Sequence, residues 1–125
     1  MKKIINTSKA PAPIGPYSQS VLANGTLFVS GQIPLDPGTG ELIQGSIEDE
    51  TTQVMKNLEA ILTEAGASFT NVVKCSIFVK NMGDFAKVNT VYGTFFDDNP
   101  PARETVEVSQ LPKGVNVEIS CIAVL

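Results

Sequence analysis

Histidine is absent from the 125-residue sequence, and cysteine occurs only twice. Without histidine, a nucleophilic triad that relies on an imidazole base is excluded. Cys75 and Cys121 are isolated, and each lies within a run typical of a strand. We therefore expect two buried thiols in a reducing cytoplasm rather than a disulfide. Because the sequence also lacks a paired-cysteine motif, we expect no metal site.

Positive charge and long hydrophobic runs are scarce too. The nine Lys and Arg residues stand against thirteen Asp and Glu residues, which gives a net charge of −4. Because the basic residues do not cluster, we expect no nucleic-acid partner. The basic segment 1–6 contains an apolar run of only two residues, which is too short for a signal peptide or a membrane anchor. These features predict a cytoplasmic protein without a membrane partner.

Hydrophobic residues make up an ordinary 42% of the sequence. This share, with a modest net charge, is typical of a soluble globular protein and not of a disordered chain. A chain of this length can bury one core without metal or disulfide support. We therefore expect residues 1–125 to form a single domain.

A hairpin is the clearest feature of the first third of the chain. The strand-like segments 18–23 and 26–30 are joined by Asn24-Gly25, a pair favoured in type I′ turns because both positions take positive φ. Gly31, at the end of the second strand, indicates either a bulge or a close approach of a ligand to the backbone.

The segments before this hairpin carry weaker signals. Ile4-Ile5 is compatible with a short first strand. Segment 10–17 is rich in proline, which predicts an extended arm lying over the domain. Tyr17 ends this arm, and its ring is suited either to covering a pocket or to packing on the core.

Helical spacing of apolar residues predicts two helices. The first covers 46–65, where Ser46 and Asp49 match a capping box and Gly66 supplies the stop. The second is expected to run from an Asp84 cap to residue 96, with Asn89 on a face that adjoins the buried one. Its buried face is expected to hold Phe85, Val88, Tyr92, Phe95 and Phe96.

Two further segments, 72–79 and 115–124, alternate as strands with one apolar face. Together these elements predict an α+β fold, in which two helices pack on one face of a mixed sheet. The inward face is expected to hold the odd-numbered residues Val73, Cys75, Ile77, Val79, Val115, Val117, Ile119, Cys121 and Ala123. The opposite face has the composition of a subunit interface: Phe28, Phe78, Ile122 and Val124 among Lys74, Ser76, Glu118 and Ser120.

Arg103 is the first candidate for chemistry. Two prolines stiffen its approach, and a strand pattern follows in which Val106 and Val108 alternate with Glu107. A guanidinium on such a rigid base loses little freedom when it binds a planar carboxylate. The alternative is a surface ion pair with Glu104 or Glu107.

Glu118 is the second candidate, because glutamate is uncommon in the middle of a strand. It lies on the face that is expected to point away from the helices. The alternative interpretation is a polar, solvated face with no chemical role.

Three motifs, taken together, resemble the RidA (YjgF-like) family of reactive-intermediate deaminases. They are 15–19 (Gly-Pro-Tyr-Ser-Gln), 30–34 (Ser-Gly-Gln-Ile-Pro) and the block that starts at 101–103 (Pro-Ala-Arg) and runs through 106–108 and 111–112 to 117–119. The resemblance covers essentially the whole chain. It implies a chorismate-mutase-like subunit and a homotrimer with sites at the subunit interfaces. It also implies hydrolysis of 2-imino acids, such as 2-iminobutyrate and 2-iminopropionate or its enamine 2-aminoacrylate, to 2-keto acids and ammonia.

The resemblance also implies roles for particular residues. Arg103 would bind the substrate carboxylate, assisted by the Gly31 backbone, and Glu118 would position a water for attack on the imine carbon. No cofactor is implied, because small imines already hydrolyse in water. The pocket would be completed by Tyr17, Ser30, Phe85 and Asn89.

One residue departs from the family pattern, in which many members carry a cysteine two positions after the arginine. This chain has Thr105 there, so a thiol-based side activity is in doubt while the deaminase residues remain. An alternative function is a non-catalytic sensor of 2-keto acids or related small carboxylates. A ribonuclease role finds no support, because the chain has no histidine pair and no basic groove.

Overall fold

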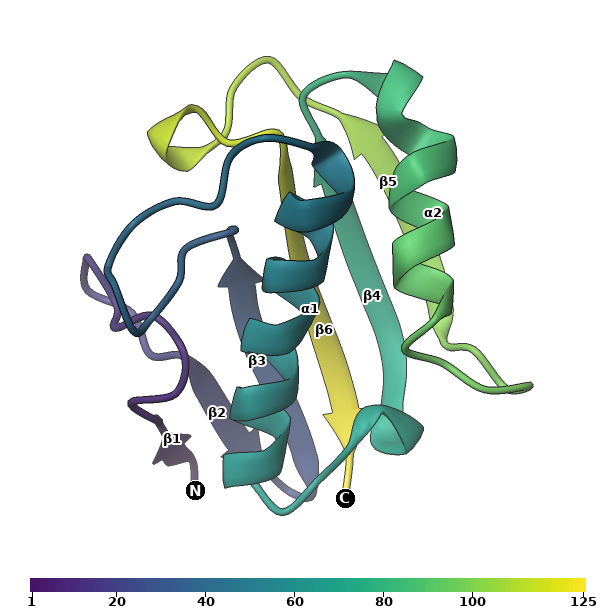
Figure 1. Ribbon diagram of the computed structural model, residues 1–125. Coiled ribbons are helices and arrows are strands. Elements are labelled where there is room, and N and C mark those ends of the chain that lie inside the picture. The colour runs from purple at the N-terminus through teal and green to yellow at the C-terminus, as the bar shows by residue number, and fades with distance from the viewer.

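The computed structural model describes residues 1–125 as a six-stranded sheet with two helices on one face (Figure 1). The strand order is β1-β2-β3-β6-β4-β5. Neighbouring strands are antiparallel except β4 and β5, which are parallel. The predicted α+β fold is confirmed. Its elements are β1 (Lys3–Ile5), β2 (Ser20–Ala23), β3 (Thr26–Gln32), α1 (Ile47–Glu64), β4 (Val72–Val79), α2 (Phe85–Gly93), β5 (Ala102–Glu107) and β6 (Val117–Val124).

The hairpin between β2 and β3 forms as predicted. Asn24 and Gly25 take φ values of 51° and 76°, as a type I′ turn requires. Further along β3 the register with β6 shifts between Val29 and Gln32. The glycine signal at Gly31 therefore marks a bulge, which re-aims the backbone locally.

Helix α1 forms as the capping signals predict. The Ser46 side chain accepts a hydrogen bond from the Asp49 backbone N–H at 3.0 Å. The helix ends at Glu64, and Gly66 follows with a φ of 78°. One face of α1 is buried against the sheet. The fully buried side chains of this core include Leu27, Met55, Leu58, Ile61, Leu62, Ile77 and Ile119.

The predictions for β4 and β6 need correction at their starts. Val73 is 48% exposed, and Val72 is buried in its place. A register shift between Val72 and Lys74 causes this exchange, because one extra residue in a strand reverses the faces before it. Val115 is buried but precedes β6, since the 3₁₀ turn Pro112–Gly114 leads into the strand.

Helix α2 is shorter than predicted. A 3₁₀ turn at Met82–Asp84 precedes it, the Asp84 side chain makes no capping hydrogen bond, and the helix ends at Gly93. Val88 and Tyr92 are buried as expected, but Phe85 is exposed. Phe95 and Phe96 lie beyond the helix and are only partly buried, with their rings packed edge-on against Phe69.

The sheet face away from the helices is left open by the chain. Phe28 and Val124 are each 49% exposed there, and the register pairs Phe28 with Ile122 and Phe78 with Glu118. This part of the predicted distribution of side chains is confirmed. No helix in the structure has the length and apolar character needed to cross a membrane.

Candidate functional site

Arg103 lies on the helix side of the sheet, at its edge. Strand β5 is the last strand of the sheet, and its parallel register places Arg103 beside Cys75 of β4. Cys75 is buried in the core beneath the helices, so the two side chains share that face. Helix α2 lies over this edge (Figure 1).

Side chains of α2 hold the Arg103 guanidinium in place. Its Nη1 donates a hydrogen bond to Oδ1 of Asn89. The guanidinium carbon also lies 5.6 Å from the centre of the Phe85 ring and 5.2 Å from that of Tyr92. Both distances are within the range of a cation–π contact. Phe85 and Asn89, which the family resemblance assigns to the pocket of Arg103, lie one turn apart on α2 and both contact its guanidinium.

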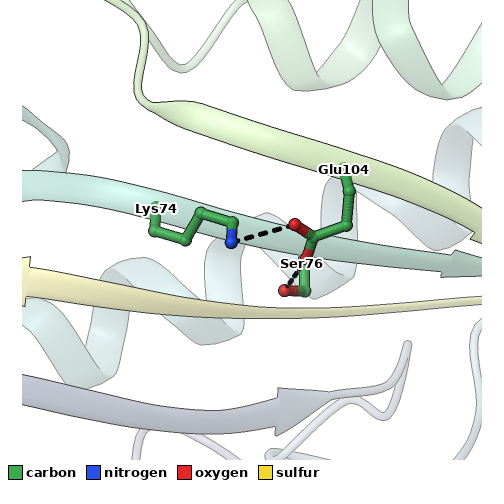
Figure 2. Close-up of polar contacts among 3 residues, drawn as sticks. All are labelled: Lys74, Ser76 and Glu104. Atoms are coloured by element: carbon green, nitrogen blue, oxygen red, sulfur yellow. Dashed lines mark hydrogen bonds and ion pairs between the residues drawn. The ribbon is translucent and has the colours of Figure 1, made fainter.

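No carboxylate of the chain neutralises Arg103. Glu104 instead forms an ion pair with Lys74 at 2.9 Å and accepts a hydrogen bond from Ser76, on the open face of the sheet (Figure 2). The carboxylate of Glu107 accepts a hydrogen bond from the Met82 backbone N–H. The alternative interpretation of Arg103 as half of a surface ion pair is therefore wrong. Its charge is held by a neutral amide and two rings, and it remains available to an external anion.

Tyr92 is a site neighbour that the sequence reasoning assigned only to the core. Tyr92 lies three residues after Asn89, and core and site share one face of α2. Its spacing is therefore compatible with a place in the core and with a place in the site. Its hydroxyl is buried without a hydrogen-bond partner, as is that of Thr105 on β5. Burial, with the Cys75 thiol nearby, raises the pKa of Tyr92 well above its ordinary value. Burial likewise raises the pKa of Cys75, so both groups stay neutral.

Glu118 lies on the opposite face of the sheet from Arg103. It belongs to β6 and pairs with Phe78 across β4, and it is half-buried. Burial raises the pKa of this carboxyl above its ordinary value, with no compensating charge or hydrogen bond from its own chain. Its carboxylate lies against Gly31, in the bulge of β3. A carboxylate in this environment is a stronger base than one in water.

Ser30 and Tyr17 lie near Gly31. The Ser30 hydroxyl donates to the Ser18 carbonyl at 2.6 Å, which anchors the bulge to the segment just before β2. Tyr17 is 49% exposed, so of its two alternatives the one in which its ring packs on the core is wrong. It lines a small hollow of about 30 Å³ together with Gly31 and the apolar residue Ile14.

The predicted site residues therefore form two clusters within one chain. Arg103, Asn89 and Phe85 meet on the helix side at the β5 edge. Gly31 and Glu118 meet on the open face, with Ser30 adjoining them in the bulge. The sheet separates the clusters. No group of three or more Cys, Asp or Glu side chains is arranged to hold a metal ion.

This small α+β protein, with an arginine that forms no ion pair on one face of its sheet and a half-buried glutamate on the other, matches known proteins along its whole length. A family described as Endoribonuclease L-PSP matches residues 7–125. A rat 2-iminobutanoate/2-iminopropanoate deaminase is 50% identical over 99% of this chain and 90% of its own.

Solved structures give the same result. A Yersinia pestis protein of the conserved Rid family superposes with a TM-score of 0.98, at 48% identity and with 100% of both chains covered. E. coli TdcF, solved with bound serine, has a TM-score of 0.94 at 42% identity, with 98% of both chains covered. The chain belongs to the RidA (YjgF-like) family, as its motifs indicate.

Proposed function

We propose that this protein is a hydrolytic deaminase that converts 2-imino acids, such as 2-iminobutanoate and 2-iminopropanoate, to 2-keto acids and ammonia. The observation that carries the proposal is the Arg103 guanidinium, which is oriented by Asn89 and two rings and is paired with no carboxylate of its own chain. The name of the 50% identical rat relative supports this reaction, and the serine in TdcF shows that a relative accommodates a small carboxylic acid.

Arg103 would bind the substrate carboxylate. The bond to Asn89 uses Nη1, which leaves other N–H donors of the planar group for two parallel hydrogen bonds to an incoming carboxylate. Each such charge-assisted bond contributes about 1.5–3 kcal/mol. The Gly31 backbone would approach the same end of the substrate, and Tyr17, Ser30 and Phe85 would complete the walls.

Glu118 would act as the general base. It takes a proton from a water molecule as the oxygen bonds to the carbon of the protonated imine, and the C=N bond becomes the C–N single bond of a neutral carbinolamine. The carboxyl then gives this proton to the amine nitrogen. As the C–N bond breaks and ammonia leaves, the C=O bond forms and the carboxylate takes up the hydroxyl proton, which it later releases to solvent. General-base assistance of this kind typically contributes about 10²–10⁴-fold.

The proposed mechanism would take these groups from two subunits, an arrangement supported by the placement of Arg103 and Glu118 on opposite faces of one sheet. The half-exposed Phe28 and Val124 give the open face the mixed apolar and polar character of an interface. We propose a homotrimer in which the open face of one chain meets the β5 edge of the next. Light scattering on the purified protein measures the mass, and a fully active monomer would contradict this arrangement.

The reaction is tested by ammonia release from freshly generated 2-iminobutanoate, with and without the protein. Arg103 is the single arginine of the sequence, so phenylglyoxal, which modifies arginine, provides a selective inhibitor. We expect inactivation that 2-oxobutanoate slows, and no such protectable modification in Arg103→Lys. Absence of any acceleration by the untreated protein would refute the proposed activity.

A carboxylate sensor is the second candidate, and the Arg103 cluster favours it because that cluster is complete without Glu118. The two functions differ in what Glu118 does. Retained binding of 2-oxobutanoate without any turnover in the native protein would favour the sensor.

A further inference from the structure

The backbone at Gly31 does not itself require glycine. Its φ lies outside the positive range, so an L-residue can adopt this conformation. Glycine is required here because a larger residue would have no room for its Cβ. A Cβ added at this position would lie 2.8 Å from Cδ and 3.1 Å from Cγ of Glu118, and closer still to Oε2.

The three nearest atoms that such a Cβ would meet all belong to Glu118. The Glu118 side chain thus lies across the Cα of Gly31, in the volume that a side chain would fill. The bulge in β3 creates this contact, because the register shift between Val29 and Gln32 brings an extra residue opposite β6. Hydrogen bonds from Ser30 to Ser18 and Gln19 hold the bulge in place, at 2.6 Å and 2.9 Å.

We infer that Gly31 is a positioning residue, whose missing side chain provides the place in which the Glu118 carboxylate lies. The expected effect of Gly31 on kcat rests on the proposed function. Its expected effect on the position of the Glu118 carboxylate does not. No hydrogen bond from its own chain fixes the Glu118 carboxylate. Its contact with the bare backbone of Gly31 therefore restricts the carboxylate to one location beside the bulge.

The central experiment is the substitution Gly31→Ala. Because the obstructing atoms are the mobile end of a side chain, we expect the variant to fold and the Glu118 carboxylate to leave its place in a crystal structure. We expect kcat to fall at least about tenfold, because a displaced base loses part of a contribution that is typically about 10²–10⁴-fold. We expect KM to change less than about twofold, since the backbone N–H and the Arg103 cluster remain.

Gly93→Ala is the matched control. Gly93 also lies outside the positive φ range, and no atom beyond its chain neighbours and the nearby backbone of α2 lies within 4 Å of where its Cβ would stand. This variant should keep wild-type kinetics and lose no stability. If Gly31→Ala lowers the melting temperature, the double variant Gly31→Ala/Glu118→Ala should restore it, because the second change removes the atoms that the methyl group meets.

A double-mutant comparison separates positioning from other roles of Gly31. In a Glu118→Gln background, Gly31→Ala should reduce kcat by less than about twofold further, because the base is already lost. A full additional loss in that background would overturn the inference, as would a Glu118 carboxylate that keeps its place in the Gly31→Ala crystal structure. If the native protein releases no ammonia, the proposed function fails, while the crystal structure still decides the positioning role.

Discussion

At the scale of single residues, the main feature of Arg103 is that no carboxylate of its own chain forms an ion pair with it. Glu104 and Glu107 lie one and four residues away, but each is engaged elsewhere. An arginine held by a neutral amide and two rings keeps its full charge for a ligand while its geometry is fixed. A sequence cannot reveal this, because both acids are near enough to form an ion pair.

Arg103→Lys should separate recognition from folding. Lysine keeps the charge but loses the planar fork, so the paired bonds to a carboxylate and the bond to Asn89 cannot both form. We expect kcat/KM to fall by about 10²-fold, which corresponds to the loss of one or two charge-assisted bonds. Thermal unfolding should change little, because the side chain is exposed. A large loss of stability at unchanged activity would indicate a structural role instead.

Glu118 should show its raised pKa in the dependence of rate on pH. The base must be ionised, so the rate should fall as pH drops through a pKa that burial holds above the ordinary value. Glu118→Gln should remove this acid limb and lower turnover at least about tenfold. Equal turnover by the two proteins would exclude the water-positioning role.

The same carboxyl should also affect stability. Because its pKa is raised in the folded state, the folded protein binds the proton more tightly, and stability is lost as pH rises through that pKa. Glu118→Gln should therefore melt at a higher temperature than the native protein near neutral pH, because glutamine carries no charge for burial to penalise. The difference should vanish in acid, where the native carboxyl is already protonated. Calorimetry at several pH values makes the comparison, and an unchanged difference across them would contradict the assignment.

At the scale of elements, helix α1 fixes the loop that follows the bulge. The Asn57 amide, which is buried, donates to the carbonyls of Ile33 and Leu35 at 3.1 Å and 2.9 Å. These bonds join the helix layer to the chain just beyond Gly31. They are polar contacts inside the core, where unmade hydrogen bonds are costly.

Asn57→Ala should therefore destabilise the protein by about 2–3 kcal/mol, since two partly buried carbonyls lose their donor. Urea unfolding measures the change. Gln53→Ala is the control, because Gln53 only donates to Asn57 at 2.9 Å and contacts the loop through it. Comparable losses of unfolding free energy in the two variants would show that the hydrogen bonds from Asn57 to the loop do not account for the stabilisation.

Local chemistry accounts for the elements that the sequence predicts well. The hairpin follows from Asn24-Gly25, and α1 from the Ser46 cap and the Gly66 stop. The start of β4 could not be predicted in this way. Val72 and Val73 are both apolar, and only the register with β6, a strand about fifty residues later, decides which is buried.

The candidate site also has parts that the local sequence predicts and parts that depend on long-range strand pairing. The meeting of Phe85, Asn89 and Arg103 was predictable from helical spacing and a family resemblance. The role of Tyr92 was not, because one face of α2 serves both core and site. The placement of Arg103 and Glu118 on opposite faces depends on the registers of β5 and β6 against β4, which no local pattern specifies.

At the scale of the whole molecule, the sheet divides the proposed chemistry into two halves. The cation lies under α2 on one face, and the base lies beside the bulge on the other. The open face that carries the base also exposes Phe28 and Val124. Association of copies would cover this apolar area and bring the two halves together, so assembly and activity should be lost together.

The most direct test of this account is to mix two inactive proteins. Arg103→Ala and Glu118→Gln subunits are dissociated reversibly, combined in equal amounts and reassembled, with each variant treated alone as the control. If each site takes Arg103 from one chain and Glu118 from its neighbour, random mixing in a closed ring should restore about a quarter of native activity. If both residues of a site come from one chain, mixing would restore nothing, and the two-subunit site would be wrong.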